Sequence, residues 1–300
     1  MSRRRGSAPR RPTRRWALLA LGAGCVVLAF GLGLWWGGAS PPRPSRPIPA
    51  KRGPTSKPSP SPAVKAPAAP PAAKPRTRPR VALVIDDLGN SLKPWPRLAA
   101  LDIPLTVAIL PHTPRGPALA RRAHARGLEV MLHLPMEPVG YPRLKPGPGA
   151  LLCAMSPTEM SRVLARDLAT VPFAAGVNNH MGSLFSRHAR LLEPVLRQIK
   201  KRGLYYLDSF TAADSQGMAA ARRLGLPTGR RDVFLDHRAT KDSIDQQMER
   251  LLKLARRRGR AIAIAHPHPV TFQALARWAP RLRREVELVR VSRILTPAGP

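Results

Sequence analysis

Two adjacent carboxylates, Asp86 and Asp87, stand at the end of a short apolar run in the stretch VALVIDDLGNS (81–91). A strand that ends in paired acids either caps a turn or contributes to a site. Other apolar runs end in residues of similar kinds, which bind divalent metals and exchange protons. These residues are His133, Asn178, Asn179, His180, Asp208, Ser209, Asp236, His237, His266 and His268. The repetition favours a site over unrelated turn caps.

Each of these residues also has an ordinary structural explanation. A single aspartate after a strand commonly caps a turn, and His133 could be a hydrogen-bonded core histidine. His112, His124 and His188 have contexts typical of loops or helix surfaces, and we assign them no function. Loop polarity alone would bring more Ser, Lys and Glu to the ends of the apolar runs. The set therefore predicts a site more strongly than any single member does.

Eight short apolar runs predict β-strands that are buried on both faces. Helix signals separate them, such as the capping box at 156–159 and the glycines Gly127 and Gly259 after two helical stretches. This alternation predicts either a parallel α/β barrel or an open doubly wound sheet, and both bind ligands at the carboxyl ends of their strands. The predicted strands are 81–86, 104–110, 128–133, 174–179, 204–208, 233–236, 261–266 and 287–292.

Six stretches, in order between about residues 80 and 295, resemble the motifs of one known family. They are ALVIDDLGNS, PLTVAILPHTP, RGLEVMLHLPMEP, GVNNHMGSLFS, GLYYLDSFT and AIAIAHPHPVT. Together they resemble the divergent polysaccharide deacetylases, a branch of the NodB-like carbohydrate esterases. The resemblance implies an α/β fold, namely a NodB-like distorted (β/α) barrel with about seven parallel strands.

The resemblance also implies roles for single residues. NodB-like enzymes carry a T-F-D-D motif whose first Asp is the general base and whose second Asp binds the metal. The sequence VIDD would therefore make Asp86 the base and Asp87 a ligand. A strand motif that ends in His supplies the general acid in that family, which points to His266.

The chain departs from the family pattern at one position. Those enzymes bind the metal with both histidines of H-x-x-x-H, whereas here His133 is followed by Glu137. A carboxylate or a histidine from the next strand can also bind zinc. We therefore predict Asp87, His133 and His180 as ligands of a divalent metal, with zinc the expected ion. Glu137 is expected to be a substitute ligand or to support one, and residues that orient these groups or contact substrate are Asn179, Asp208, Ser209, Asp236 and His268.

The predicted reaction is metal-dependent hydrolysis of an acetyl group from an envelope glycan. The alternative is a catalytically inactive glycan-binding or envelope-scaffolding protein with the same fold, and the change at Glu137 favours it. Binding alone needs neither a base nor an acid, so Asp86 and His266 favour the enzyme.

The first 80 residues predict a membrane-attached arrangement. Residues 16–38 carry no charge and are long enough to span a hydrocarbon core of about 30 Å. The arginine-rich segment 1–15 should stay in the cytoplasm, which places the C-terminal part outside a bacterial inner membrane, in the periplasm or beyond. A cleaved signal peptide is the alternative. The Pro-rich segment 39–79 predicts a disordered linker and leaves 80–300 as the deacetylase domain.

The net charge of +34 raises the possibility of a nucleic-acid binder. The basic tract is split by the apolar segment, however, and no zinc-finger, RNP-type or basic-zipper signature is present. A GC-rich genome would also enrich Arg, Ala, Pro and Gly without an electrostatic purpose. We therefore expect no nucleic-acid partner.

Only Cys153 lies in the predicted domain, so no disulfide can form within it, and no motif indicates an oligomer.

Overall fold

The computed structural model describes residues 78–295. The predicted cytoplasmic segment 1–15, the membrane segment 16–38 and nearly all of the linker 39–79 lie outside these described residues. Within 78–295, no helix has the length and apolar character that a membrane crossing requires.

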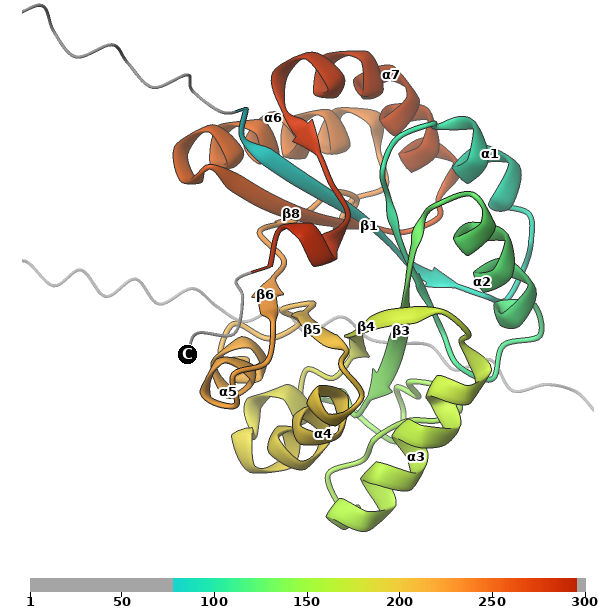
Figure 1. Cartoon of the computed structure of the whole chain (residues 1–300), viewed down its shortest axis with the longest axis vertical. Helices are drawn as coiled ribbons and strands as arrows, with labels where there is room; N and C mark the ends of the chain where they lie inside the picture. The colour runs from blue at the N-terminus through green and yellow to red at the C-terminus, as the bar shows by residue number, and fades with distance from the viewer. Residues whose placement is uncertain (1–77, 296–300) are drawn as a thin grey trace, which may run out of the picture. The chain divides into compact units, whose positions relative to one another are not determined.

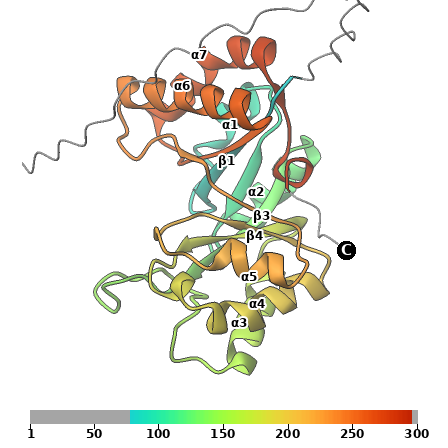
Figure 2. The same cartoon turned by 90° about the vertical axis from the view of Figure 1, so that its left-hand side faces the viewer.

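The described residues form one parallel sheet that curls into an open half-barrel, with helices around its outside (Figures 1 and 2). The strand order is β6-β5-β4-β3-β2-β1-β8-β7, and β9 pairs with β1. Within 78–295 no strand pairing joins β6 to β7, so the sheet stays open there. The strands are β1 (Arg80–Leu88), β2 (Thr106–Ile109), β3 (Glu129–Met136), β4 (Ala174–Met181), β5 (Tyr205–Asp208), β6 (Thr228–Arg230), β7 (Val233–Phe234), β8 (Arg260–Ala265) and β9 (Glu287–Leu288).

The start of α3 and the end of α6 lie where the sequence signals indicate. Ser156 and Glu159 form a capping box at the start of α3, and Gly259 takes a left-handed conformation after α6. The helices are α1 (Trp95–Ala100), α2 (Gly116–Ala125), α3 (Pro157–Thr170), α4 (Ala189–Lys201), α5 (Gly217–Arg223), α6 (Lys241–Arg258) and α7 (Pro269–Glu285).

The parallel α/β prediction is confirmed, but the number and length of the strands differ from it. The sheet has nine strands rather than about seven. The sequence analysis missed β6, because Thr228-Gly229-Arg230 has no apolar run and becomes a strand only by pairing with β5. The predicted strand 287–292 ends at Leu288, and a 3₁₀ turn follows in which the Ser292 N–H donates to the Glu129 carboxylate.

Both faces of the sheet are buried, as the continuous apolar runs predict. In β1, Val81, Leu83 and Ile85 pack in the large core under the helices, whereas Ala82 and Val84 join a smaller core on the concave face. Val291 and Ile294, which follow β9 in the chain, also belong to the smaller core. The alternation along each strand therefore decides which side chains face the inside of the half-barrel.

Gly176 in β4 is required by a close approach inside the half-barrel. A methyl group added at this position would lie 2.2 Å from Tyr205 Cε2. Tyr205 cannot easily move, because its hydroxyl donates to the buried Glu129 carboxylate at 2.9 Å. Glycine leaves the room that this ring needs.

We expect Gly176→Ala to lower the free energy of unfolding by about 1–3 kcal/mol, because the added methyl overpacks the concave core. Urea denaturation of the full chain measures it. The double variant Gly176→Ala/Tyr205→Leu serves as the control, because removing the ring should make the two effects less than additive. Full additivity, or an unchanged stability of Gly176→Ala, would contradict this account of the packing.

Candidate active site

Strand alternation brings polar side chains from several strands to the carboxyl rim of the half-barrel. In β1 the inward-facing series Ala82 and Val84 continues to Asp86. The same alternation continues from Met131 to His133 in β3, and from Ile262 and Ile264 to His266 after β8. The register of β3 with β4 places Asn178 beside His133.

Asp87 departs from this alternation, which alone would turn it away from Asp86. The pairing of β1 with β2 shifts register between Ile85 and Leu88, and Asp87 adopts a left-handed φ of 56°. Aspartate tolerates this conformation better than most residues do. The irregularity lets both carboxylates of the VIDD sequence face the same cavity.

Asp87, His133 and His180 bring three ligand atoms together. Asp87 Oδ1 lies 3.0 Å from His133 Nε2 and 2.9 Å from His180 Nδ1, and the two histidine nitrogens are 3.1 Å apart. Atoms bound to one zinc ion at about 2.0–2.2 Å are separated by roughly 3 Å. The three predicted ligands therefore form a group that could hold a divalent metal.

Asn178, to which the sequence analysis assigned no role, links this group to Asp86. Its Nδ2 donates to Asp86 Oδ1 at 2.9 Å, and its Oδ1 accepts from His133 Nδ1 at 2.9 Å. A proton on Nδ1 leaves the Nε2 lone pair of a neutral His133 pointing at Asp87 and His180. A hydrogen bond or a metal ion is needed between these atoms.

The pKa values of the group reflect the same need for positive charge. Burial raises the pKa of Asp86, against the opposing effects of His133 and Asn178. Burial also acts to raise the pKa of Asp87, but hydrogen bonds from His133 and His180 outweigh it and hold that pKa well below its usual range. Burial lowers the pKa of His133, and the nearby Asp86 and Asp87 more than reverse this. Two carboxylates on one small cavity favour a divalent cation.

His266 faces the same cavity from the other side and is oriented by Asp236. Its Nδ1 lies 3.0 Å from Asp236 Oδ1, while Asp236 Oδ2 accepts from the His266 backbone N–H and from Thr271 Oγ1. The free Nε2 lies 3.7 Å from Asp87 Oδ2. Burial tends to lower the pKa of His266, but the bond with Asp236 dominates and raises it. His266 is thus placed to donate a proton at Nε2.

Three other predicted residues lie outside the group of three ligand atoms. Glu137 is outside the three-ligand group, and its carboxylate accepts the Cys153 backbone N–H at 2.6 Å, which ties the loop 138–152 to the end of β3. Asp208 points away from the cavity and caps the turn before α5 through Phe210, Ser215 and Met218. His268 is exposed at the start of α7, close to Asp236 and His266.

Asn179, Ser209 and Arg231 line the cavity with the site residues. Asn179 accepts from the Ser209 backbone N–H and from Tyr206, and so fixes the loop after β5. The sequence analysis missed Arg231, which donates to the carbonyl oxygens of Ser209 and Phe210. It lies in the link between β6 and β7, where no apolar pattern marked the approach to the site. The cavity volume is about 200 Å³.

This geometry lies within a region that matches a protein-family model described as divergent polysaccharide deacetylase, over residues 83–295. The chain belongs to the divergent polysaccharide deacetylase family. It is 36% identical over 216 residues to the uncharacterized protein YibQ of Escherichia coli, which covers 72% of this chain and 67% of that protein. An uncharacterized protein of Haemophilus influenzae is 30% identical over 210 residues, or 70% of this chain and 74% of that protein.

A solved structure also resembles this family member. The crystal structure of an uncharacterized protein from Agrobacterium tumefaciens C58 superimposes with a TM-score of 0.69 at 33% identity, over 72% of this chain and 89% of the other. A protein structure from Enterococcus faecalis, with a TM-score of 0.51 at 13% identity over 71% of this chain and 98% of the other, shares the fold alone. The fold is thus shared with solved structures.

We expect Asp236→Asn to lower the pKa of His266, because the substitution removes the carboxylate that stabilises the charged imidazole. NMR titration of the histidine ring protons, in the full chain with a chelator present, measures this pKa. The ring signals of the exposed His188 are the internal control. A His266 pKa that is the same in parent and variant would contradict the assigned role of Asp236.

Proposed function

We propose that this chain is a metal-dependent hydrolase that removes acetyl groups from an envelope glycan. One observation carries the proposal: a group of three metal-ligand atoms, a buried carboxylate and an aspartate-oriented imidazole all face one cavity. Membership of a deacetylase family supports the reaction class.

Asp87, His133 and His180 would hold the divalent ion, for which zinc is the expected identity. When bound, such an ion lowers the pKa of a water molecule and polarises a carbonyl group. Asn178 keeps the lone pair of His133 directed at the ion position through its bond to Nδ1.

Asp86 is the proposed general base. Asn178 Nδ2 donates a hydrogen bond to Asp86 Oδ1. Asp86 Oδ2 receives no hydrogen bond from Asn178 and lies 3.6 Å from His133 Nε2. This oxygen is expected to take a proton from the water that attacks the acetyl carbon. Burial keeps Asp86 out of bulk water, so its charge acts in a low-dielectric setting.

His266 is the proposed general acid. A new C–O bond forms between the water oxygen and the acetyl carbon, and the bond from that carbon to the sugar nitrogen or oxygen breaks. The Nε2 proton of His266 goes to the departing amine or alcohol, and acetate is the second product. Asp236 holds Nδ1 and stabilises the protonated ring before transfer.

We also propose that the segment 16–38 anchors the chain in the inner membrane and that the domain works in the periplasm or outside the cell. The seven arginines before the segment and its uncharged apolar length support this orientation. An extended Pro-rich linker could hold the domain at a distance on the order of 100 Å from the membrane. The envelope glycan would lie within this reach.

A catalytically inactive glycan-binding or scaffolding protein is the second candidate. Glu137 stands where the family has its second metal histidine, and this replacement favours the binding protein. The Glu137 carboxylate accepts the Cys153 backbone N–H and is not part of the three-ligand group. The orientation of His266 by Asp236 favours the enzyme, because binding does not require a proton donor.

We expect the full chain, purified in non-ionic detergent without chelator, to contain close to one divalent ion. Asp87→Ala and His180→Ala should each abolish it, because a three-residue site rarely keeps its metal after one ligand is lost. His188→Ala, which removes an exposed histidine, is the matched control and should retain the ion. Mass spectrometry of the bound metals measures the content. No metal in the parent after zinc is added back would contradict the hydrolase proposal.

We expect Asp86→Asn and His266→Gln to lower kcat/KM for acetate release about 10²–10⁴-fold, the usual contribution of a positioned acid or base. Acetylated envelope glycans and chito-oligosaccharides are the substrates, and released acetate is measured. Both variants should keep the metal, which separates loss of proton transfer from loss of the ion. A metal-loaded parent that releases no acetate from these glycans would favour the binding protein instead.

A further inference from the structure

An arginine-rich cleft leads away from the candidate site along the open side of the half-barrel. We call it the arginine cleft and define it by Arg222, Arg230, Arg231, Arg250, Arg258 and Arg260. These residues come from α5, from the end of β6 and the link that follows it, from α6 and from the start of β8. None of them was assigned a function from the sequence.

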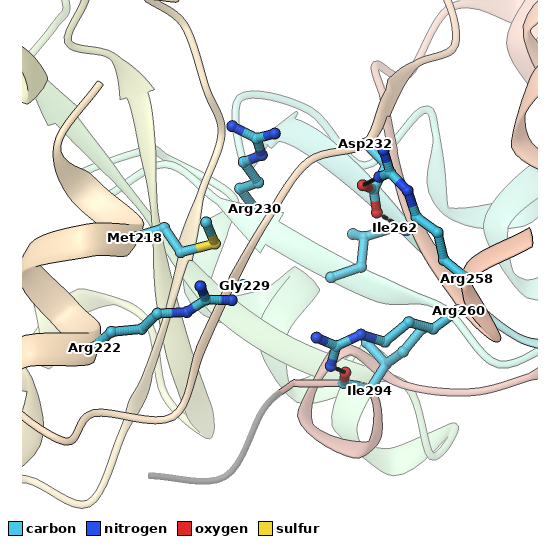
Figure 3. A pocket seen from close by; sticks show the side chains of 9 residues that line it. All are labelled: Met218, Arg222, Gly229, Arg230, Asp232, Arg258, Arg260, Ile262 and Ile294. Carbon is cyan, nitrogen blue, oxygen red and sulfur yellow. Dashed lines mark hydrogen bonds and ion pairs between the residues drawn. The ribbon is translucent and has the colours of Figure 1, made fainter. Parts of the chain in front are cut away.

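Shared lining residues connect the cleft to the site. Arg231 and Phe234 line both the candidate cavity and a neighbouring hollow of about 500 Å³ beside α6. Arg230 and Arg258 line that hollow and also a third one of about 180 Å³. Figure 3 shows this third hollow, with Arg222 of α5 on one side and Arg260 of β8 on the other. The three spaces therefore adjoin one another.

Positive charge in the arginine cleft is poorly balanced. Asp232 is the one acidic residue among the described residues that line the second and third hollows. Its carboxylate is already engaged by Arg258 Nη1 and the Ile262 backbone N–H, both at 2.9 Å. Within the described part of the chain, no carboxylate pairs with Arg222 or Arg250. Burial lowers the pKa of Arg231 and the nearby Arg250 lowers it further, while Asp86 and Asp208 act to raise it.

Arginine abundance alone does not explain this imbalance. On the face formed by α6 and α7, arginines have acidic partners: Arg256 pairs with Glu285, Arg277 with Asp245, and Arg281 with Glu249 and Glu285. On α6 itself, Arg256 and Arg258 each have an acidic partner, whereas Arg250 has none among the described residues. Unpaired guanidinium groups in a concave surface are expected to attract an anion.

Aromatic rings hold two of the guanidinium groups in place. Arg230 lies over the ring of Phe210, with Cζ 4.5 Å from the centroid, and Arg231 lies over Phe234 at 4.7 Å. The side chain of Arg230 makes no hydrogen bond within residues 78–295, so its N–H groups are available to a ligand. Stacking of this kind fixes a guanidinium while leaving its donor edge exposed.

We propose that the arginine cleft binds anionic groups of the glycan substrate, on sugar units next to the one that carries the acetyl group. Guanidinium groups pair with carboxylate and phosphate oxygens through two parallel hydrogen bonds. The adjoining hollows between Arg231 and Arg222 suit a chain that carries such groups on successive units. The inference rests on the proposed function for the position of the acetyl group, but anion binding itself needs no turnover.

The test compares two double variants of the full chain in non-ionic detergent. Arg222→Glu/Arg250→Glu alters the cleft, and Arg121→Glu/Arg284→Glu makes the same charge change at exposed positions outside the hollows described above. The probes are fluorescent oligogalacturonate, a fluorescent glycerol-phosphate oligomer and neutral chitohexaose. The basic N-terminal segment is common to both variants, so differences between them report on the cleft.

We expect the cleft variant to weaken binding of at least one anionic probe about tenfold or more, the effect of losing two charge-assisted hydrogen bonds. The control variant and the neutral probe should change less than about twofold, since screening weakens the effect of distant charges. The probe that responds identifies the anion as carboxylate or phosphate. Equal weakening by both variants, or no preference of the parent for anionic probes, would overturn the proposal. So would tighter binding of a single-stranded oligonucleotide than of either anionic probe.

Footprinting of the parent chain covers the case in which the cleft variant does not fold. The responding probe should protect Arg222 and Arg250 from modification by phenylglyoxal and leave Arg121 and Arg284 reactive, as peptide mass spectrometry measures. Uniform protection would overturn the inference. Acetate release from neutral chitohexaose tests the proposed function separately. If acetate is released but anionic probes are not preferred, only the proposal for the arginine cleft is wrong. If anionic probes are preferred but no acetate is released, only the hydrolase proposal is wrong.

Discussion

The candidate site depends on the position of one amide, that of Asn178. By donating to Asp86 and accepting from His133, it joins the proposed base to the proposed metal group and sets the tautomer of the imidazole. An unpaired carboxylate and histidine at this depth would be costly to bury. With the amide in place, the ligand atoms of His133, His180 and Asp87 lie within about 3 Å of one another, and one divalent ion could satisfy all three.

Part of this arrangement can be read from the sequence. Apolar runs that end in Asp, His or Asn predict strands whose polar ends share a rim, and alternation places Asp86, His133 and His266 on the inner face. The approach of Asp87 cannot be read in this way, because it depends on a register shift and a left-handed residue in β1. The position of His180 depends on the register between β3 and β4. Neither property leaves a local signal in the sequence.

The open side of the sheet was also beyond the reach of sequence patterns. The strand β6 has no apolar run, and the path of residues 228–234 follows from pairing with β5 on one side and β8 on the other. A closed barrel would fill this gap with paired strands. Because the sheet stays open, arginines from α5, α6 and β8 line hollows that adjoin the cavity. The proposed selectivity for anionic glycans depends on this opening.

X-ray absorption at the zinc edge, on the full chain reconstituted with zinc, tests the central claim most directly. We expect zinc to have nitrogen and oxygen ligands at about 2.0–2.2 Å, together with outer scattering from two imidazole rings. In His180→Ala, loaded with zinc at high concentration, we expect scattering from one imidazole ring instead of two. Sulfur ligation at about 2.3 Å, or zinc without imidazole scattering, would contradict the claim that Asp87, His133 and His180 form the metal site.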